Sequence, residues 1–370
     1  MRKTASVSMV KDECDIIELF VRINLRFVDR MFIIDNRSTD GTVAIIKRLQ
    51  EEGCPVTLWH DDNVDFQQGL TTTTAARKIV DEYDPDWIIP LDADEFLTEN
   101  GQKLLAELED IPDQQCGILQ WRTFVPLSGD YASFENPLWH NFRQRKVETF
   151  QLSKVVIPAN LAKTSKLTTG NHHLTNSDNQ RIPEFTLSTT LAHVPVRSSE
   201  QIVAKSIIGN IKHQITWNRH EGDGFHWGIM AQLAKTSNYR FDDLQLQEIA
   251  FAYSQKPDRE IIREFDAEKR IGSENDRIRY PELSGIHILE RFDNFIQELC
   301  GALQQNQLQS QIAKSFAYET EKLQETIEIQ EKELRFFRKT ALGKAVGYLT
   351  RKAYRLRQTG KQCRKENAHD

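Results

Sequence analysis

The first hundred residues alternate between short apolar runs and longer segments in which apolar residues recur every three or four positions. The apolar runs cover residues 5–10, 31–34, 55–59 and 87–91, and each one predicts a buried strand. The segments between them predict helices over residues 16–25, 42–52 and 71–83, with Asp15 and Thr42 as caps of the first two. This strand–helix alternation predicts an α/β fold with a parallel sheet and helices on both faces.

Beyond residue 100 the same periodicities predict further elements and a division into three regions. Strands are expected over residues 117–124 and 154–158, and helices over 102–108, 241–253, 259–268 and 288–303. We interpret residues 1–230 as one α/β domain, residues 231–305 as a helical subdomain, and residues 306–370 as a C-terminal helical extension.

Polar and acidic side chains cluster where three of the predicted strands end. The clusters are Asp12-Glu13, Asp35-Asn36 and Asp92-Ala93-Asp94-Glu95. In an open α/β sheet, ligands bind beyond the carboxyl ends of the strands, so we expect the three clusters to converge. Carboxylates this close together repel each other unless a divalent cation such as Mg²⁺, Mn²⁺ or Ca²⁺ lies among them, and such a cation would also bind phosphate oxygens. A solvated acidic loop is the alternative interpretation of residues 92–95.

Composition and motifs exclude several other classes of protein. The net charge of −6 and the isoelectric point of about 6.0 give no sign of a nucleic-acid partner. The five cysteines form no CxxC pair, so disulfide bonds and a zinc ribbon are not expected, and a reducing compartment fits best. No secretory signal and no long apolar run is present, so we expect a cytoplasmic protein without a membrane span. Neither GxGxxG nor GxxxxGKS/T occurs, so a nucleotide site would depend on carboxylates and a metal.

Three motifs, in this order along the chain, resemble one known family. They are Val10-Lys11-Asp12-Glu13, Ile34-Asp35-Asn36-Arg37-Ser38-Thr39-Asp40-Gly41-Thr42 and Asp92-Ala93-Asp94-Glu95-Phe96. They resemble the opening of family 2 glycosyltransferases, and most of all the bacterial family 2-like group with a D-x-D-E-F motif. The resemblance covers about residues 5–215. It implies a GT-A fold, which is Rossmann-like, a nucleotide-sugar donor, and inverting transfer by direct displacement. One departure is Asp12, because many relatives have Asn at that position.

The resemblance also gives roles to individual side chains. Asp35 corresponds to the acidic residue that contacts the base or ribose of the donor, although it could instead cap the next helix. Asp92 and Asp94 correspond to the D-x-D pair that holds the metal and the sugar diphosphate. The expected nucleotide-binding set is Lys11, Glu13, Asp35, Asn36, Arg77 and Asp92.

Arg77 and two histidines have two interpretations each. Arg77 could pair with a phosphate bidentately, or it could be an ordinary helix residue at the surface. His193 is the preferred third metal ligand beside the D-x-D pair and His172 is the second choice, since imidazole binds Mn²⁺-like metals. The stretch His193–Ser198 partly matches a His-Tyr-x-x-x-Ser pattern of the relatives, with Val194 in place of the tyrosine. A buried structural histidine is the alternative at both positions.

Inverting transfer needs a general base that deprotonates the acceptor hydroxyl, and a carboxylate is the usual choice. Glu184 and Glu221 lie in plausible loops, but we select Asp223 and Asp130 as the candidate catalytic residues. Asp223 lies in a glycine-containing segment where aromatic residues adjoin acids, and an ordinary glycine turn is the alternative. Lys205 could face a phosphate, or it could be a solvated helix residue.

The C-terminal region has a different character from the rest of the chain. Two heptad positions, 316, 323, 330, 337 and 320, 327, 334, 341, are mostly apolar, which predicts a weak coiled coil and a homo-oligomer, or a single long helix. Residues 334–365 contain no acid, and their basic residues are interleaved with apolar ones, as in helices that lie on anionic membranes. A solvated helix or tail is the alternative. A peripheral position at the inner face of a membrane would suit polysaccharide biosynthesis on a lipid carrier.

The leading hypothesis is a glycosyltransferase that moves a sugar from a nucleotide-sugar donor to a glycan or lipid-linked glycan acceptor. A divalent metal, Mn²⁺ or Mg²⁺, would neutralise the diphosphate leaving group. Two alternatives remain open. One is a nucleotidyltransferase on a similar sheet, which would more often carry a basic glycine-rich loop after the first strand. The other is an inactive nucleotide-sugar-binding module that organises a membrane complex.

Overall fold

The computed structural model describes residues 3–63, 67–98, 101–127, 138, 141–148, 152–215, 225–253, 261–268, 270–305, 322, 328 and 332. The chain divides into two compact units, Met1–Leu299 and Cys300–Asp370. The predicted domain boundaries at residues 230 and 305 stay predictions. The predicted coiled coil and basic tail lie almost entirely outside the described residues. Among the described residues, no helix combines the length and the apolar composition needed to cross a membrane.

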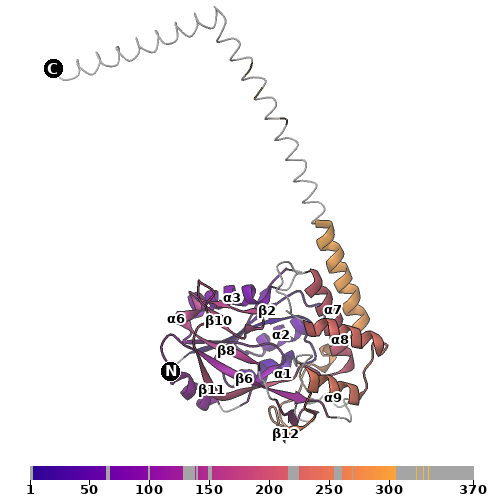
Figure 1. The fold of residues 1–370 in the computed structure, drawn as a ribbon, viewed down its shortest axis with the longest axis horizontal. Coiled ribbons are helices and arrows are strands. Elements are labelled where there is room, and N and C mark those ends of the chain that lie inside the picture. Colours follow the sequence, from indigo (N-terminus) through magenta and orange to yellow (C-terminus); the bar gives the residue numbers. More distant parts are fainter. Residues whose placement is uncertain are drawn as a thin grey trace, which may run out of the picture. The chain divides into compact units, whose positions relative to one another are not determined.

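A mixed sheet is the central feature of the first unit (Figure 1). Its strands span Thr4–Val10 (β1), Arg30–Asp35 (β2), Val56–His60 (β3), Trp87–Pro90 (β4), Glu95–Leu97 (β5), Cys116–Val125 (β6), Gln144–Lys146 (β7), Ser153–Pro158 (β8), Glu184–His193 (β11) and Phe265–Glu268 (β12). The order is β12-β7-β6-β8-β4-β1-β2-β3, and β11 pairs with β5 and β6. The strands β3, β2, β1 and β4 are parallel, whereas β8 is antiparallel to β4 and β6. A separate ribbon pairs Lys166–Leu167 (β9) with Leu174–Thr175 (β10).

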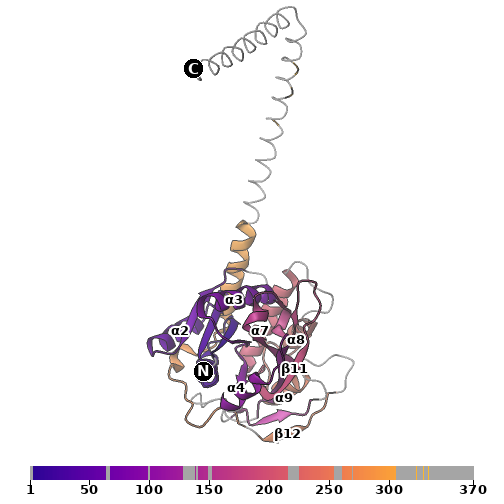
Figure 2. The ribbon, with the colours of Figure 1, turned by 90° about the vertical axis from the view of Figure 1, so that its left-hand side faces the viewer.

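Helices flank both faces of this sheet (Figures 1 and 2). One face packs against Ile17–Asn24 (α1), Thr42–Glu51 (α2) and Gly101–Glu109 (α4), and the other against Gln68–Tyr83 (α3) and Ala159–Ala162 (α6). A third apolar cluster joins Ser199–Ile215 (α7), Phe225–Thr236 (α8) and Asp243–Ala252 (α9). Short 3-10 turns cover Thr169–Asn171 (η1) and Pro281–Leu283 (η2), and residues 288–299 are helical.

Strands β1, β2 and β4 are buried on both faces, which explains their mostly apolar sequences, whereas β3 at the edge of the sheet is only partly buried. On β2, Met31 and Ile33 belong to the core cluster of α1 and α2, whereas Phe32 and Ile34 belong to the cluster of α3. Successive side chains of a strand point to opposite faces, so apolar or small residues are favoured at every position when both faces are covered. The predicted α/β class, with helices on both sides of a sheet, is confirmed.

Three local predictions are wrong. Residues 265–268 form strand β12, and not part of a helix over 259–268, because they pair with the edge strand β7. Asp15 does not cap α1, since its carboxylate binds Arg197. Thr42 does not cap α2 either. It is the first residue of that helix, and its amide donates to Asp40 Oδ1 at 2.9 Å.

Candidate functional site

The carboxyl ends of β4, β1 and β2 lie next to one another and carry most of the predicted site residues. These three strands are adjacent and parallel, so the loops that follow them leave the same edge of the sheet. Glu13 follows β1, Asn36 follows β2, and Asp92 and Asp94 follow β4. The structure therefore brings together the three clusters that the sequence places at strand ends, while the roles expected for their side chains stay predictions.

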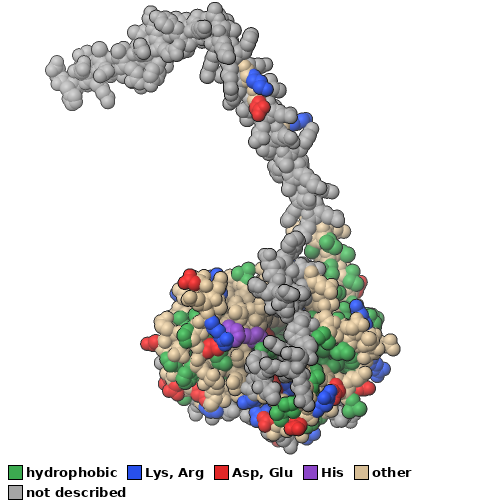
Figure 3. Space-filling model, viewed as in Figure 1, with side chains coloured by type: hydrophobic (Ala, Val, Ile, Leu, Met, Phe, Trp, Pro, Cys, Tyr) green, Lys and Arg blue, Asp and Glu red, His purple; other side chains and the backbone are tan. Residues whose placement is uncertain are grey.

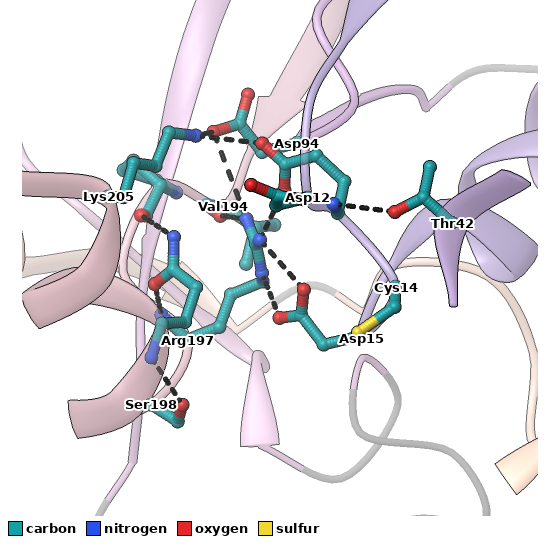
Figure 4. Close-up of polar contacts among 12 residues, drawn as sticks. Asp12, Cys14, Asp15, Thr42, Asp94, Val194, Arg197, Ser198 and Lys205 are labelled. Atoms are coloured by element: carbon teal, nitrogen blue, oxygen red, sulfur yellow. Dashed lines mark hydrogen bonds and ion pairs between the residues drawn. The ribbon is translucent and has the colours of Figure 1, made fainter. Parts of the chain in front are cut away.

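One half of the site is a buried network of ion pairs around Arg197 and Lys205 (Figure 4). The Arg197 guanidinium donates to Asp15 Oδ2 at 2.6 Å and to Glu13 Oε2 at 2.5 Å. Lys205 donates to Asp94 Oδ2 at 2.9 Å and to Glu13 Oε1 at 3.2 Å. Two cations from the start of α7 thus hold three carboxylates that come from the loops after β1 and β4.

The sequence around residue 197 explains how these cations are positioned. The Ser198 hydroxyl accepts the amide hydrogen of Gln201 at 3.1 Å, which is the hydrogen bond of a helix N-cap. The Gln201 side chain in turn accepts the Arg197 amide at 3.1 Å. Arg197 is therefore fixed just before α7, and Lys205 lies about two turns later on the same helix.

The pKa values follow from this balance of burial and charge. Burial raises the pKa of the Asp94 carboxyl, but Lys205, His193 and Arg197 lower it by more, so the pKa lies well below its usual range. Burial lowers the pKa of Lys205, and the Asp94 and Glu13 carboxylates raise it beyond the ordinary lysine value. For Glu13, burial prevails and raises the carboxyl pKa. Asp94 and Lys205 are consequently both charged at neutral pH.

The other half of the site surrounds Asp92, whose side chain is 30% exposed. Asp92 Oδ2 accepts from Lys154 Nζ at 2.6 Å, and Asp92 Oδ1 accepts from Gln68 Nε2 at 2.8 Å. The Asp92 amide donates to Glu95 Oε2 at 2.9 Å. Glu95 is fully buried, and this burial raises the pKa of its carboxyl well above the usual range. Lys154, also fully buried, lies 3.4 Å from Glu95 Oε1.

Asp35, Asn36 and Lys11 form a third group beyond β1 and β2. The Asp35 carboxylate accepts from the Ser38 amide at 3.3 and 3.2 Å and so braces the loop before α2, without capping that helix. Asn36 accepts from Lys212 Nζ at 2.8 Å. Lys11 donates to the Arg37 carbonyl at 2.8 Å.

The two candidate metal-ligating histidines are held by neighbouring side chains and backbone. His193 is buried and stacks on Trp121 with ring centroids 3.9 Å apart. Burial lowers the pKa of His193 to about 3, so the imidazole is neutral at pH 7. His172 Nδ1 lies 2.7 Å from the Ser153 carbonyl, and burial lowers the pKa of His172 to about 4. Histidine side chains also reach the surface, where Figure 3 shows them beside basic and acidic groups.

The side chains that are present do not form a ready divalent-cation site. In the part of the chain that the structure describes, no three His, Cys, Asp or Glu side chains converge as a metal centre requires. Asp92 and Asp94 instead point to two different lysines, Lys154 and Lys205. The ligand set Asp92, Asp94 and His193 therefore stays a prediction.

The remaining candidates lie apart from these groups or outside the described residues. Arg77 Nη2 donates to the Ser165 carbonyl at 3.0 Å and so ties α3 to the segment before β9. Glu184 pairs with Arg181 at 2.6 Å and with His173 at 3.0 Å. Asp130 and Asp223, together with Glu221, lie outside the described residues.

Sequence reasoning missed Lys154 and Arg197 as members of the site. Lys154 precedes the apolar residues of β8, and a lysine at the edge of a strand ordinarily indicates a solvated side chain. Arg197 lies inside the stretch His193–Ser198 that was singled out for its histidine, so the nearest signal was a basic residue beside a helix-capping serine. Their acidic partners are far away in sequence, which is why no local pattern identifies them.

Comparison with known proteins identifies the domain that carries these residues. Residues 14–160 match the family model described as Glycosyl transferase family 2. No curated protein matches the sequence of the chain. Among solved structures, S. aureus TarS 1-349 in complex with UDP is 11% identical, with 69% of this chain and 76% of that chain covered, at a TM-score of 0.32. The mannosyltransferase PcManGT from Pyrobaculum calidifontis, in complex with GDP-Man and Mn2+, is 13% identical, with 68% and 75% covered, at a TM-score of 0.33.

Both TM-scores are low, so the assignment depends on the family model and not on these structures. The matched segment contains strands β2 to β8, with the ends of β2 and β4, and it begins in the loop that follows β1, just after Glu13. The resemblance found in the sequence and the expected GT-A class of α/β fold are thereby confirmed. Residues 14–160, with Asp35, Asp92 and Asp94 among them, are a glycosyl transferase family 2 domain.

Proposed function

We propose that the chain is a glycosyltransferase that moves a sugar from a nucleotide-sugar donor to a glycan or lipid-linked glycan acceptor. The observation that carries this proposal is the placement of Asp92 and Asp94 beyond β4, beside the groups that follow β1 and β2 in a family 2 domain. Ligands of open α/β sheets bind at this edge, so a donor that lies across the three strand ends would meet all of these groups.

The groups at the two ends of the site suit different parts of such a donor. Asp35 and Asn36 are polar acceptors and donors of the kind that bind a base or a ribose. At the other end, the cations Lys205 and Arg197 are charged at neutral pH and offset the carboxylates around them. The resemblance predicts metal-dependent transfer with Mn²⁺ or Mg²⁺, and such a cation would supply positive charge to the diphosphate leaving group.

Several parts of the reaction stay predictions. Direct displacement with inversion needs a carboxylate base for the acceptor hydroxyl, and its candidates Asp223 and Asp130 lie outside the described residues. Acceptor, membrane contact and homo-oligomerisation depend on loops and on a C-terminal region that the structure leaves almost entirely undescribed.

Calorimetric titration of UDP, GDP, UDP-glucose and GDP-mannose, each with Mn²⁺ and with a chelator, tests the proposal. We expect one nucleotide series to bind the wild type with Mn²⁺. Asp94→Asn should weaken binding of its sugar conjugate by about tenfold, because the substitution removes a carboxylate that would hold the predicted cation beside the diphosphate. Asp81→Asn is the matched control, since Asp81 is 69% exposed on α3. Absence of binding by the wild type to every nucleotide and conjugate would refute the function.

The same samples separate the two alternatives. A nucleotidyltransferase would bind a nucleoside triphosphate and release pyrophosphate in the presence of a sugar phosphate. An inactive binding module would bind a nucleotide sugar but would neither transfer nor slowly hydrolyse the sugar. Both reactions release free nucleotide, so an assay for free nucleotide distinguishes the module from an enzyme.

A further inference from the structure

Asp92 belongs to a closed ring of hydrogen bonds. Its Oδ1 accepts from Gln68 Nε2 at 2.8 Å, and Gln68 Oε1 accepts from the Gly170 amide at 3.1 Å. The Gly170 carbonyl accepts from Lys154 Nζ at 2.8 Å, and Lys154 Nζ returns to Asp92 Oδ2 at 2.6 Å. Each of the four residues therefore contacts the next one, and both carboxylate oxygens of Asp92 are held.

The ring joins four separate parts of the fold. Gln68 begins α3, Asp92 follows β4, Lys154 lies on β8, and Gly170 lies in η1. Hydrogen bonds to such distant segments fix the carboxylate more firmly than contacts within one loop would. The side chain can shift only by breaking its contacts with several elements of the fold. Lys154 and Gln68 are buried, whereas Asp92 is partly open to solvent.

Gly170 is required in the ring for a reason of backbone geometry. Its φ of +77° is in the left-handed region, which favours glycine. A Cβ at this position would also overlap the His172 ring. His172 is itself held by the Ser153 carbonyl, next to Lys154 in β8, so it cannot move away without disturbing the strand.

The chemistry of a held carboxylate indicates which part of a donor it contacts. Ionised Asp92 can only accept hydrogen bonds, and its oxygens keep further lone pairs beyond those that Gln68 and Lys154 use. A phosphate that contacts this carboxylate directly, with no cation between them, would be repelled by its charge, whereas a sugar hydroxyl can donate to it. A fixed acceptor also loses little conformational freedom on binding, so its contribution to affinity is larger.

We propose that Gln68, Lys154 and Gly170 are positioning residues that hold Asp92 as an acceptor for hydroxyl groups of the transferred sugar. The ring thereby sets how strongly the site prefers a nucleotide sugar over the bare nucleotide. This inference rests on the proposed function.

The test compares the affinity for a nucleotide sugar with the affinity for its nucleotide, using UDP-glucose against UDP and GDP-mannose against GDP. Gln68→Met removes one member of the ring, with its hydrogen bonds to Asp92 and Gly170, and adds no charge. We expect it to weaken binding of the sugar conjugate about tenfold while the free nucleotide changes by less than about twofold. Gly170→Ala should have the same selective effect. Gly53→Ala, at another glycine with positive φ and nothing within 4 Å of its Cβ position, controls for backbone strain alone.

A double variant distinguishes a ring from independent contacts. If the ring acts as a unit, Gln68→Met with Gly170→Ala will bind the sugar conjugate no worse than either single variant, because one broken link already frees Asp92. Multiplying effects, or equal losses of nucleotide and conjugate, would overturn the inference. Lys154→Met leaves the buried carboxylate of Glu95 and the partly exposed one of Asp92 without their shared cation, which can prevent folding. Lys154→Arg therefore replaces it as the third probe. If the wild type binds neither the UDP nor the GDP series, both the proposed function and this inference are refuted. If the wild type binds and the variants keep its preference for the nucleotide sugar over the nucleotide, only the inference is refuted.

Discussion

Lys205 on α7 lies 2.9 Å from Asp94 Oδ2, although the two residues are 111 positions apart in the sequence. The same ammonium lies 3.2 Å from Glu13 Oε1, so it joins the loop after β1 to the loop after β4. Helix α7 therefore supplies counter-charge to the acidic motif that follows β4. Glu13 and Asp94 therefore share Lys205 as a cationic partner.

Lys205→Met should destabilise the protein, because it leaves Glu13 and Asp94 near each other with Arg197 as the remaining cation of the cluster. The Lys205 side chain is 26% exposed, so we expect a loss of about 1–3 kcal/mol, below the value for a fully buried pair. Urea unfolding measures it. Lys163→Met removes a lysine from the exposed ion pair with Asp81 and should change the free energy of unfolding by less than about 1 kcal/mol. Equal losses in the two variants would contradict the network described here.

Arg197→Lys should be costly although it keeps the charge. The guanidinium donates to both oxygens of Asp15 through Nε and Nη2, and Nη2 also donates to Glu13, so a single ammonium cannot reproduce that fork. We expect a loss of about 1–3 kcal/mol in the free energy of unfolding. Arg181→Lys is the matched control, because Arg181 makes a similar bidentate pair with Glu184 but is 55% exposed. If Arg197→Lys leaves the free energy of unfolding unchanged, Asp15 and Glu13 do not need the forked guanidinium.

Gly41→Ala tests a close approach next to the site. A Cβ on Gly41 would overlap the carbonyl of Leu283, where η2 packs against the start of α2. Backbone cannot move away as a flexible side chain can, so we expect a loss of about 1–3 kcal/mol and a lower melting temperature. Gly228→Ala meets its nearest neighbour at 3.7 Å inside helix α8 and should be neutral or stabilising by about 0.5–1 kcal/mol. Similar melting temperatures for both variants would show that η2 yields easily.

The sequence was informative where a signal is local. The apolar runs of β1, β2 and β4 are buried on both faces, so composition alone predicts them and the loops that follow. Strand β11 was not predicted, although its Glu184–His193 sequence contains strand-favouring threonines, because it has no continuous apolar run and its place comes from pairing with β5 and β6. The helix expected over residues 259–268 fails for a similar reason, since hydrogen bonding to β7 outweighs the helical pattern.

The acidic side chains of the candidate site were predicted, whereas the ion pairs that hold them were not, and Lys154 and Arg197 were missed. Asp92 and Asp94 stand in one short loop, and their spacing in a motif identifies them. Their partners Lys154 and Lys205 are ordinary lysines in the sequence, and only the packing of β8 and α7 against the strand ends reveals what they contact. Ion pairs between distant segments have no sequence pattern of their own, so the partners of Asp92 and Asp94 could not be predicted from the sequence.

Lys146 should give the protein a stability that rises with pH in the alkaline range. Its buried ammonium donates to the carbonyls of Ala250, Phe251 and Tyr253, and burial lowers its pKa to about 8, against an ordinary value of 10.5. Between about pH 8 and pH 10.5 the unfolded chain therefore binds more protons than the folded one, and stability rises by up to about 1.4 kcal/mol per pH unit from this group. Lys146→Met lacks the group, so its stability relative to wild type should fall as the pH rises from about 8 to about 10. Urea unfolding of both proteins at several pH values measures this difference. A difference that does not vary with pH would refute the lowered pKa, and Lys163→Met, at an exposed lysine, is the matched control.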